Sequence, residues 1–230
     1  MRIKQTIANA YNWLKGVFKK RYIVIHYSAG SIDSDENNGA YFSRERTGTS
    51  ANVFVDDDSV TISVPLESTA YHCGVDYSNG KAPFWGKCTN KNSIGIEMCG
   101  IANDKFLDMR NKTIKNTVTF TKKIIKKYGI KVKNVIRHYD ICGKNCPAPF
   151  VKEPLAWDCF KLNLRGTLKV RTMAAGVKLR RKINGEPVGQ LKNKKVVEIK
   201  RVYYEDGKLW GKNVQGYIIC LDNTNYKKYL

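Results

Sequence analysis

Histidine, acidic side chains and long hydrophobic runs are scarce in this sequence. Only 3 of the 230 residues are histidine, and there are 20 acidic residues against 41 basic ones. No run of about 18 or more apolar residues occurs, so we predict no transmembrane helix. The first 21 residues have basic ends but no continuous apolar stretch and no small-residue cleavage site, so we expect no secretory signal peptide.

The seven cysteines include no pair of Cys-x-x-Cys units. An odd number at irregular spacing argues against a secreted disulfide framework and favours a chain made in a reducing compartment. Cys73 and Cys88 could still pair across a loop, and the sequence leaves that question open.

The net charge is +21, and about half of it falls in residues 167–230, which contain 15 basic and 5 acidic residues. A surface this positive favours a polyanion: nucleic acid, anionic lipid or the anionic polymers of a bacterial cell wall. The sequence has no RNP-type aromatic strand, no zinc-finger spacing and no recognition-helix pattern. We therefore expect no nucleic-acid partner; the oligomeric state stays open.

Strands mixed with helices predict an α/β domain over residues 1–163. We predict strands at residues 22–28, 51–56, 60–64, 93–100 and 131–138, and a helix at residues 113–128 that Gly129 caps. A further helix is predicted at residues 3–18, where apolar residues follow one another at spacings of 4, 3, 4 and 3. We expect this helix to pack on the domain, with an interfacial membrane helix as the alternative.

Residues 167–230 have a different texture, in which short apolar pairs alternate with basic residues and glycine. Turn signals stand at Asn184-Gly185 and Asp206-Gly207. Several short strands separated by such turns predict a small β-barrel, joined to the first domain near residues 163–167.

Two of the three histidines, His26 and His138, end predicted strands, and Cys146 follows the second in a proline-rich loop. A lone histidine at such a place is usually a hydrogen-bonded core residue, but imidazole and thiolate together are zinc ligands. Three protein ligands leave a fourth position open, which is typical of a catalytic site. A structural zinc site would need a fourth ligand, and Cys142 or Asp140 could supply it.

Glu97 lies inside the apolar stretch "SIGIEMCG". A carboxylate there is costly unless it is paired or functional, the alternative being an outward-facing surface residue. Hydrolysis at a metal site needs a base for the proton of water and a positive group facing the oxygen where charge develops.

Four blocks, "YIVIHYSAG", "TSANVFV", "NSIGIEMCG" and "RHYDICGKNCPAPF", resemble in order those of the type 2 N-acetylmuramoyl-L-alanine amidases. This zinc amidase family includes the T7-type phage lysozyme and the peptidoglycan recognition proteins. The resemblance covers about residues 20–160 and implies a mixed central β-sheet flanked by helices. It also implies that His26, His138 and Cys146 bind Zn²⁺, and that the chain hydrolyses the amide between N-acetylmuramic acid and L-alanine of bacterial peptidoglycan.

The same resemblance implies further roles. Glu97 is expected to be the general base, and Lys144 to face the carbonyl oxygen, with a solvated loop lysine as the alternative. His72 and Asn52 are expected to contact substrate; a core or surface histidine is the alternative for His72. One departure concerns the catalytic tyrosine of T7-like members, because Ala51 stands at that position and its role must pass to Glu97.

The segments "VKLRRKINGEPVGQL", "KKVVEIKRV", "KLWGKN" and "GYIICLD" resemble a bacterial SH3-like domain, covering residues 167–230. Such domains dock wall peptides or polymers, here through a face that Tyr203, Tyr204, Trp210 and Tyr217 could form, although Trp210 is expected to be half core.

Together the two resemblances imply a phage endolysin of a Gram-positive host, made in the host cytoplasm and acting on the wall after release. A non-catalytic peptidoglycan-binding protein of the same fold is the alternative, but the retained Cys146 argues against it. A basic nucleic-acid-binding protein is the less favoured alternative.

Overall fold

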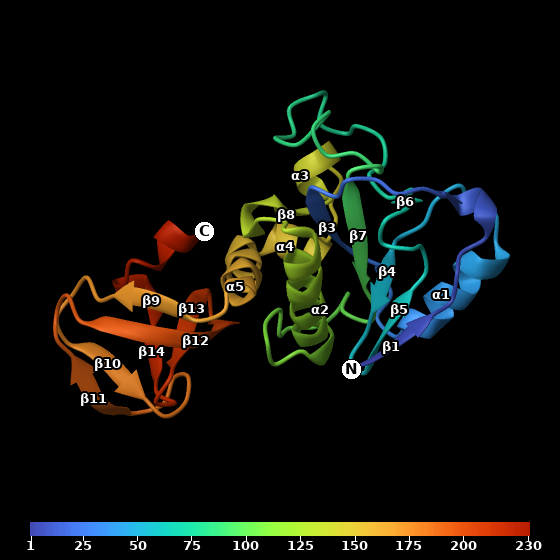
Figure 1. Ribbon diagram of the computed structural model, residues 1–230. Helices are drawn as coiled ribbons and strands as arrows, with labels where there is room; N and C mark the ends of the chain where they lie inside the picture. Colours follow the sequence, from blue (N-terminus) through green and yellow to red (C-terminus); the bar gives the residue numbers. More distant parts are fainter. The chain divides into compact units, whose positions relative to one another are not determined.

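The computed structural model describes residues 1–230 as two compact units (Figure 1). The first unit comprises residues 1–105 and 111–152, and the second comprises residues 106–110 and 153–230.

The boundary between the units lies at residues 152 and 153, earlier than the predicted junction near residues 163–167. The helix α5 (Pro154–Leu164) lies in the sequence between the observed boundary and the predicted one. Its residues Cys159 and Leu162 are fully buried in the hydrophobic core of the second unit, which is why the helix belongs there.

A six-stranded mixed sheet forms the centre of the first unit. In spatial order its strands are β1 (Arg2–Gln5), β5 (Ser59–Ile62), β4 (Val53–Val55), β7 (Ser93–Met98), β3 (Tyr22–Tyr27) and β8 (Val135–Arg137). The strands β4, β7, β3 and β8 are parallel neighbours, whereas β5 is antiparallel to β4. All five predicted strands are present, each somewhat shorter than predicted; β8 is shortened most, because a 3₁₀ turn precedes it. The central strands β3 and β7 are mostly apolar because both of their faces are covered, and His26, Ser93 and Glu97 are their polar exceptions.

Helices α1 (Asp35–Arg44) and α2 (Lys112–Tyr128) cover opposite faces of this sheet (Figure 1). The predicted second helix is confirmed. The Asn111 side chain accepts a hydrogen bond from the Ile114 amide at its start. Gly129 ends it in the left-handed conformation, with φ +65°, that favours glycine. Two short helices, α3 (Tyr139–Cys142) and α4 (Ala148–Lys152), follow β8.

The predicted helix at residues 3–18 is wrong. The segment contains β1, a 3₁₀ turn (Ala10–Asn12) and β2 (Trp13–Leu14), which pairs with β6 (Thr69–Ala70). Tertiary contacts override the helical spacing. The buried Asn12 side chain accepts hydrogen bonds from the amides of Thr47 and Gly48 and donates to two carbonyl oxygens, which holds the backbone in its turn.

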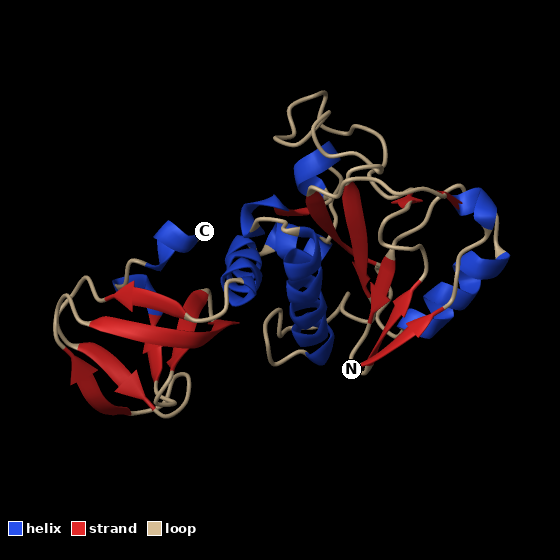
Figure 2. Ribbon diagram, viewed as in Figure 1, coloured by secondary structure: helices blue, strands red, loops and turns tan.

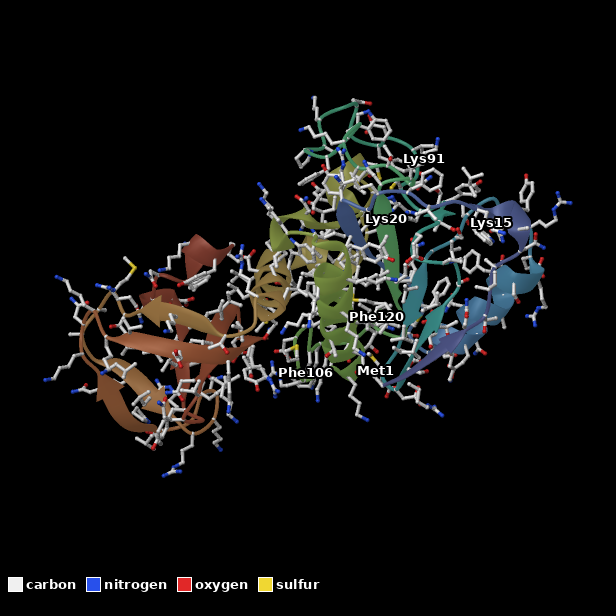
Figure 3. All side chains as sticks on the ribbon, in the orientation of Figure 1. Met1, Lys15, Lys20, Lys91, Phe106 and Phe120 are labelled. Atoms are coloured by element: carbon white, nitrogen blue, oxygen red, sulfur yellow. The ribbon has the colours of Figure 1, made fainter.

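Lys20 lies just before β3, where Figure 3 labels it. It is buried and joins two loops. Its Nζ donates to the carbonyl oxygens of Ser68, at 2.7 Å, and Lys91, at 3.1 Å. Burial lowers its pKa to about 8. The two segments that lead into β6 and β7 are thereby tied to the start of β3.

The second unit is built on strands, apart from α5 and two 3₁₀ turns (Figure 2). Its antiparallel sheet has the order β11 (Pro187–Leu191), β10 (Val177–Arg180), β14 (Ile218–Cys220), β13 (Lys208–Asn213), β12 (Val196–Glu205) and β9 (Leu168–Arg171). The predicted turn at Asp206-Gly207 joins β12 to β13, and both of its residues have positive φ, as a two-residue hairpin requires.

Two of the aromatic residues suggested for a binding face of the second unit have contacts inside that unit. Trp210 is buried rather than half core, and the Tyr204 hydroxyl donates to Glu153 at 2.7 Å. Tyr217 lines a groove whose volume is about 450 Å³.

None of the helices has the length and the apolar character that crossing a membrane would require.

Candidate metal centre and active site

A cleft of about 240 Å³ lies at the carboxyl ends of the parallel strands β3, β7 and β8. Its floor contains His26 of β3, Glu97 of β7 and Phe54 of β4, which are register partners on adjacent strands. Register partners project from the same face of a sheet. In open α/β sheets this edge is where ligands usually bind.

The structure brings the three predicted metal ligands together. The donor atoms of His26, His138 and Cys146 all lie within 4.8 Å of one another, and all three residues are buried. His138 follows β8 directly. A turn through α3 then returns Cys146, whose carbonyl oxygen accepts a hydrogen bond from the Tyr139 amide at 2.8 Å.

Hydrogen bonds leave one ring nitrogen of each histidine for a metal. Nε2 of His138 lies 2.9 Å from the carbonyl oxygen of Cys73, and Nε2 of His26 lies 3.1 Å from Nδ1 of His72. The Nδ1 atoms remain, and that of His26 is 3.8 Å from Sγ of Cys146. This combination of two imidazoles and a thiol suits zinc.

The electrostatics of the site also fit a metal. Burial lowers the pKa of His26 well below its usual value and that of His138 to about 4, so both imidazoles stay neutral as ligands must. Burial, together with the charge of Glu97, raises the pKa of Cys146 to about 12. A thiolate at such a place requires a cation beside it, and a metal ion supplies one.

Neither alternative fourth ligand joins this group. Asp140 accepts hydrogen bonds from the Arg137 amide at 2.8 Å and from its guanidinium at 2.7 Å. Cys142 lies in an apolar cluster with Ile136 and Ile141. The group therefore offers three candidate ligands, the number that a catalytic zinc site uses.

Glu97 points into the cleft, so the outward-facing alternative is wrong. Its Oε1 lies 3.9 Å from Nδ1 of His26, and its Oε2 is buried without a hydrogen-bond partner. Burial raises its pKa to about 8, although the charge of Lys144 opposes the rise. Lys144 itself is an exposed residue that lines the cleft, two residues before Cys146.

The predicted substrate contact at Asn52 is wrong, because this side chain is fully buried and does not line the cleft. Its Oδ1 accepts from the Gly95 amide at 2.9 Å, and its Nδ2 donates to the Pro65 carbonyl at 3.2 Å. Asn52 therefore joins β4 to β7. His72 lines the cleft but is buried, and Nε2, its second ring nitrogen, lies 3.1 Å from Ser93 Oγ.

Several cleft residues were not predicted from the sequence: Tyr27, Phe42, Thr49, Ser50 and Tyr71. Tyr27 and Tyr71 each adjoin a predicted site histidine, which is the one signal that could have identified them. Ala51 also lines the cleft, so the position of the family's tyrosine is part of the site.

Comparisons with known proteins agree with this geometry. The family model described as N-acetylmuramoyl-L-alanine amidase matches residues 18–149. N-acetylmuramoyl-L-alanine amidase BlyA of Bacillus subtilis is 31% identical over 70% of this chain and 44% of its own length. N-acetylmuramoyl-L-alanine amidase CwlL of Bacillus licheniformis is 29% identical over 66% of this chain and 42% of its own. The chain thus spans less than half the length of these relatives.

Solved structures show the same fold. The catalytic domain of XlyA matches 71% of this chain and 99% of its own, with 26% identity and a TM-score of 0.58. A mutant endolysin from Bacillus subtilis matches the same shares with 28% identity and a TM-score of 0.57.

Proposed function

The chain belongs to the N-acetylmuramoyl-L-alanine amidase family, and on this premise we propose that it is a zinc hydrolase. Its proposed reaction is hydrolysis of the amide bond between N-acetylmuramic acid and L-alanine in bacterial peptidoglycan. The observation that carries this proposal is the convergence of His26, His138 and Cys146 in a cleft that also contains Glu97.

Each site residue has a distinct task in this reaction. The two histidines and Cys146 would hold the zinc ion, which supplies Lewis acidity that polarises a carbonyl group and acidifies water. Glu97 lies beside His26, where the charge of a bound zinc ion would favour its carboxylate, so it can take a proton from the attacking water and pass it to the leaving amine. Lys144 places a positive charge on the cleft wall, where it can stabilise the negative oxygen of the tetrahedral intermediate.

The experiment is the release of new L-alanine amino termini from purified Gram-positive peptidoglycan, with zinc measured on every protein. Wild type should bind about one zinc per chain and release these termini. Cys146→Ser should lose zinc and activity together, whereas Cys142→Ala should keep both. Glu97→Gln should keep zinc and lose activity on the order of 100-fold or more.

Two results would contradict the amidase proposal. Wild type that binds wall and zinc but releases no amino termini would make the chain a peptidoglycan-binding protein. Zinc retained in Cys146→Ser would place the metal elsewhere.

For the second unit we propose an SH3-like fold that binds anionic polymers of the cell wall. A polar pocket of about 130 Å³ supports this role. Lys178 and Arg180 line it, no acidic side chain does, and Nη1 of Arg180 is buried without a hydrogen-bond partner. A guanidinium and an ammonium in one polar pocket suit a phosphate or carboxylate group.

Retention on purified walls tests this pocket in the full-length protein. Arg180→Ala should weaken retention on walls that carry phosphate-containing polymers more than Lys200→Ala, which removes one exposed charge outside the pocket. If both variants lose the same retention, general charge attraction accounts for the interaction. If wild type is retained equally on walls with and without those polymers, the polymers are not the ligand.

We further propose that the protein serves as a phage endolysin of a Gram-positive host, made in the host cytoplasm and reaching the wall after release. The likeness to an endolysin from Bacillus subtilis supports this role. Lysis of host cells only when the protein is supplied together with a membrane lesion would test it, and lysis on expression without a lesion would contradict it.

A further inference from the structure

We propose that His72 is a positioning residue that, with Ser93, holds His26 in the one tautomer able to bind a metal through Nδ1. This inference rests on the proposed zinc site. It gives His72 a task that differs from the substrate contact predicted for it.

A chain of hydrogen bonds assigns the protons. Ser93 Oγ lies 2.6 Å from the carbonyl oxygen of Thr89, and a carbonyl can only accept, so the serine hydroxyl donates there. Ser93 Oγ then offers lone pairs to Nε2 of His72, at 3.1 Å, which must carry a proton. A neutral imidazole that donates through Nε2 accepts at Nδ1.

The same logic extends to the metal site. Nδ1 of His72 lies 3.1 Å from Nε2 of His26, so His26 donates through Nε2. Its Nδ1 keeps a lone pair and lies 3.8 Å from Sγ of Cys146. The Cys73 thiol is 3.9 Å from Nδ1 of His72, a weak donor at long range compared with the His26 ring.

The fold holds the His72 ring at this position from two sides. The backbone amides of His72 and Cys73 both donate to Oδ1 of Asn90, at 2.9 and 2.8 Å. On β7, Ser93, Gly95 and Glu97 project from one face, since they alternate along the strand. A Cβ on Gly95 would lie 2.7 Å from Cγ of His72, so glycine makes room for the ring.

Cys73 and Gly74, which follow His72 in the sequence, position the second histidine ligand, His138. The carbonyl oxygen of Cys73 lies 2.9 Å from Nε2 of His138 and accepts its proton, which leaves Nδ1 of His138 for the metal. Gly74 has φ +69°, and a Cβ there would lie 3.1 Å from the same Nε2. The segment His72-Cys73-Gly74 thus sets both histidine ligands, one through a side chain and the other through a carbonyl group.

Such partners of metal ligands typically contribute 10- to 100-fold in metal affinity. His72→Phe keeps a planar ring, somewhat larger than imidazole, but no acceptor faces His26. His72→Asn places a side-chain oxygen near the position of Nδ1, so it should restore part of the interaction. Ser93→Ala leaves both histidines in place and removes the hydroxyl that fixes the tautomer of His72, together with its hydrogen bond to the Thr89 carbonyl.

The test combines zinc affinity, by competition with a chromophoric chelator, with the histidine tautomers read from nitrogen-15 NMR of the metal-free full-length protein. Wild-type His26 should carry its proton on Nε2. His72→Phe should lower zinc affinity by about 10- to 100-fold. His72→Asn should fall between the two, and Ser93→Ala should give a mixture of His26 tautomers and a smaller loss of affinity.

Unchanged zinc affinity and an unchanged His26 tautomer in His72→Phe would overturn the proposal. A raised KM with unchanged zinc affinity would instead return His72 to the role of a substrate contact. If His72→Phe does not fold, Ser93→Ala decides, because an unaltered tautomer there contradicts the proposed chain. The tautomers are measured without metal or substrate. A failed activity test therefore contradicts the amidase proposal and leaves the tautomer result unaffected.

Discussion

At the scale of single residues, neighbours decide what a polar side chain does. Asp140 and Glu97 are both carboxylates close to the candidate metal ligands. Asp140 is paired with Arg137, while Glu97 lines the cleft and has one buried oxygen without a partner. A buried carboxyl group with an unpartnered oxygen is costly for folding, and the role proposed for Glu97 would account for its presence.

Asn52→Ala is expected to reduce stability without affecting chemistry. The change leaves the buried Gly95 amide and the Pro65 carbonyl without their side-chain partner, which should cost about 1–3 kcal/mol. Urea unfolding measures the loss, and zinc content and KM should stay at wild-type values. A raised KM at unchanged stability would restore the predicted substrate contact.

At the scale of elements, the first residue of α1, Asp35, is hydrogen-bonded to side chains of β5. Asp35 is fully buried and accepts hydrogen bonds from Ser59 Oγ, at 2.9 Å, and Thr61 Oγ1, at 2.8 Å. Burial, followed by its interaction with Asp56, raises the pKa of Asp35 to about 6. Helix and strand are thereby joined by a group whose charge depends on pH.

The raised pKa of Asp35 predicts that the stability of the protein depends on pH. A carboxyl whose folded pKa is raised binds its proton more tightly when folded, so its contribution is greatest below the unfolded pKa of about 4. That contribution should disappear as the pH rises from about 4 to about 6. Asp35→Asn removes the titrating group and should flatten this part of the profile.

Unfolding of the metal-free proteins at a series of pH values measures the effect as the difference between wild type and Asp35→Asn. As the pH rises from about 4 to about 6, the unfolding free energy of wild type should fall relative to that of Asp35→Asn. A rise in the unfolding free energy of wild type relative to Asp35→Asn would mean that the folded protein favours the ionised form of Asp35.

At the scale of the whole molecule, two units with separate cores share a net charge of +21. The second unit adds to its charge a groove and a small polar pocket. Charge explains attraction to polyanions in general, whereas the pocket can select one kind of anion.

Retention of the full-length protein on purified cell walls should therefore outlast its retention on DNA as salt rises. Screening from about 0.05 to about 0.5 M salt weakens exposed charge pairs, so DNA retention should be lost first. Elution of the protein from columns of each material measures the difference. Release from both at the same salt concentration would mean that charge alone accounts for binding.

The sequence determined the central strands, the second helix and the identity of the three candidate ligands. These depend on local chemistry: apolar runs for buried strands, caps for a helix, and imidazole and thiol groups for a metal. His26 and His138 stood out because histidine is rare and both end predicted strands, and Cys146 because it follows in the next loop; the resemblance to the family blocks then named all three.

Only the tertiary structure decided the course of residues 3–18, the place of α5, and the tasks of Asn52 and His72. In each case the deciding partner is distant in the sequence. Asn12 lies against residues near 47, and Asn52 bonds to Gly95. His72 lies between His26 and Ser93 because Gly95 leaves it room, and no local pattern encodes a space that another strand provides.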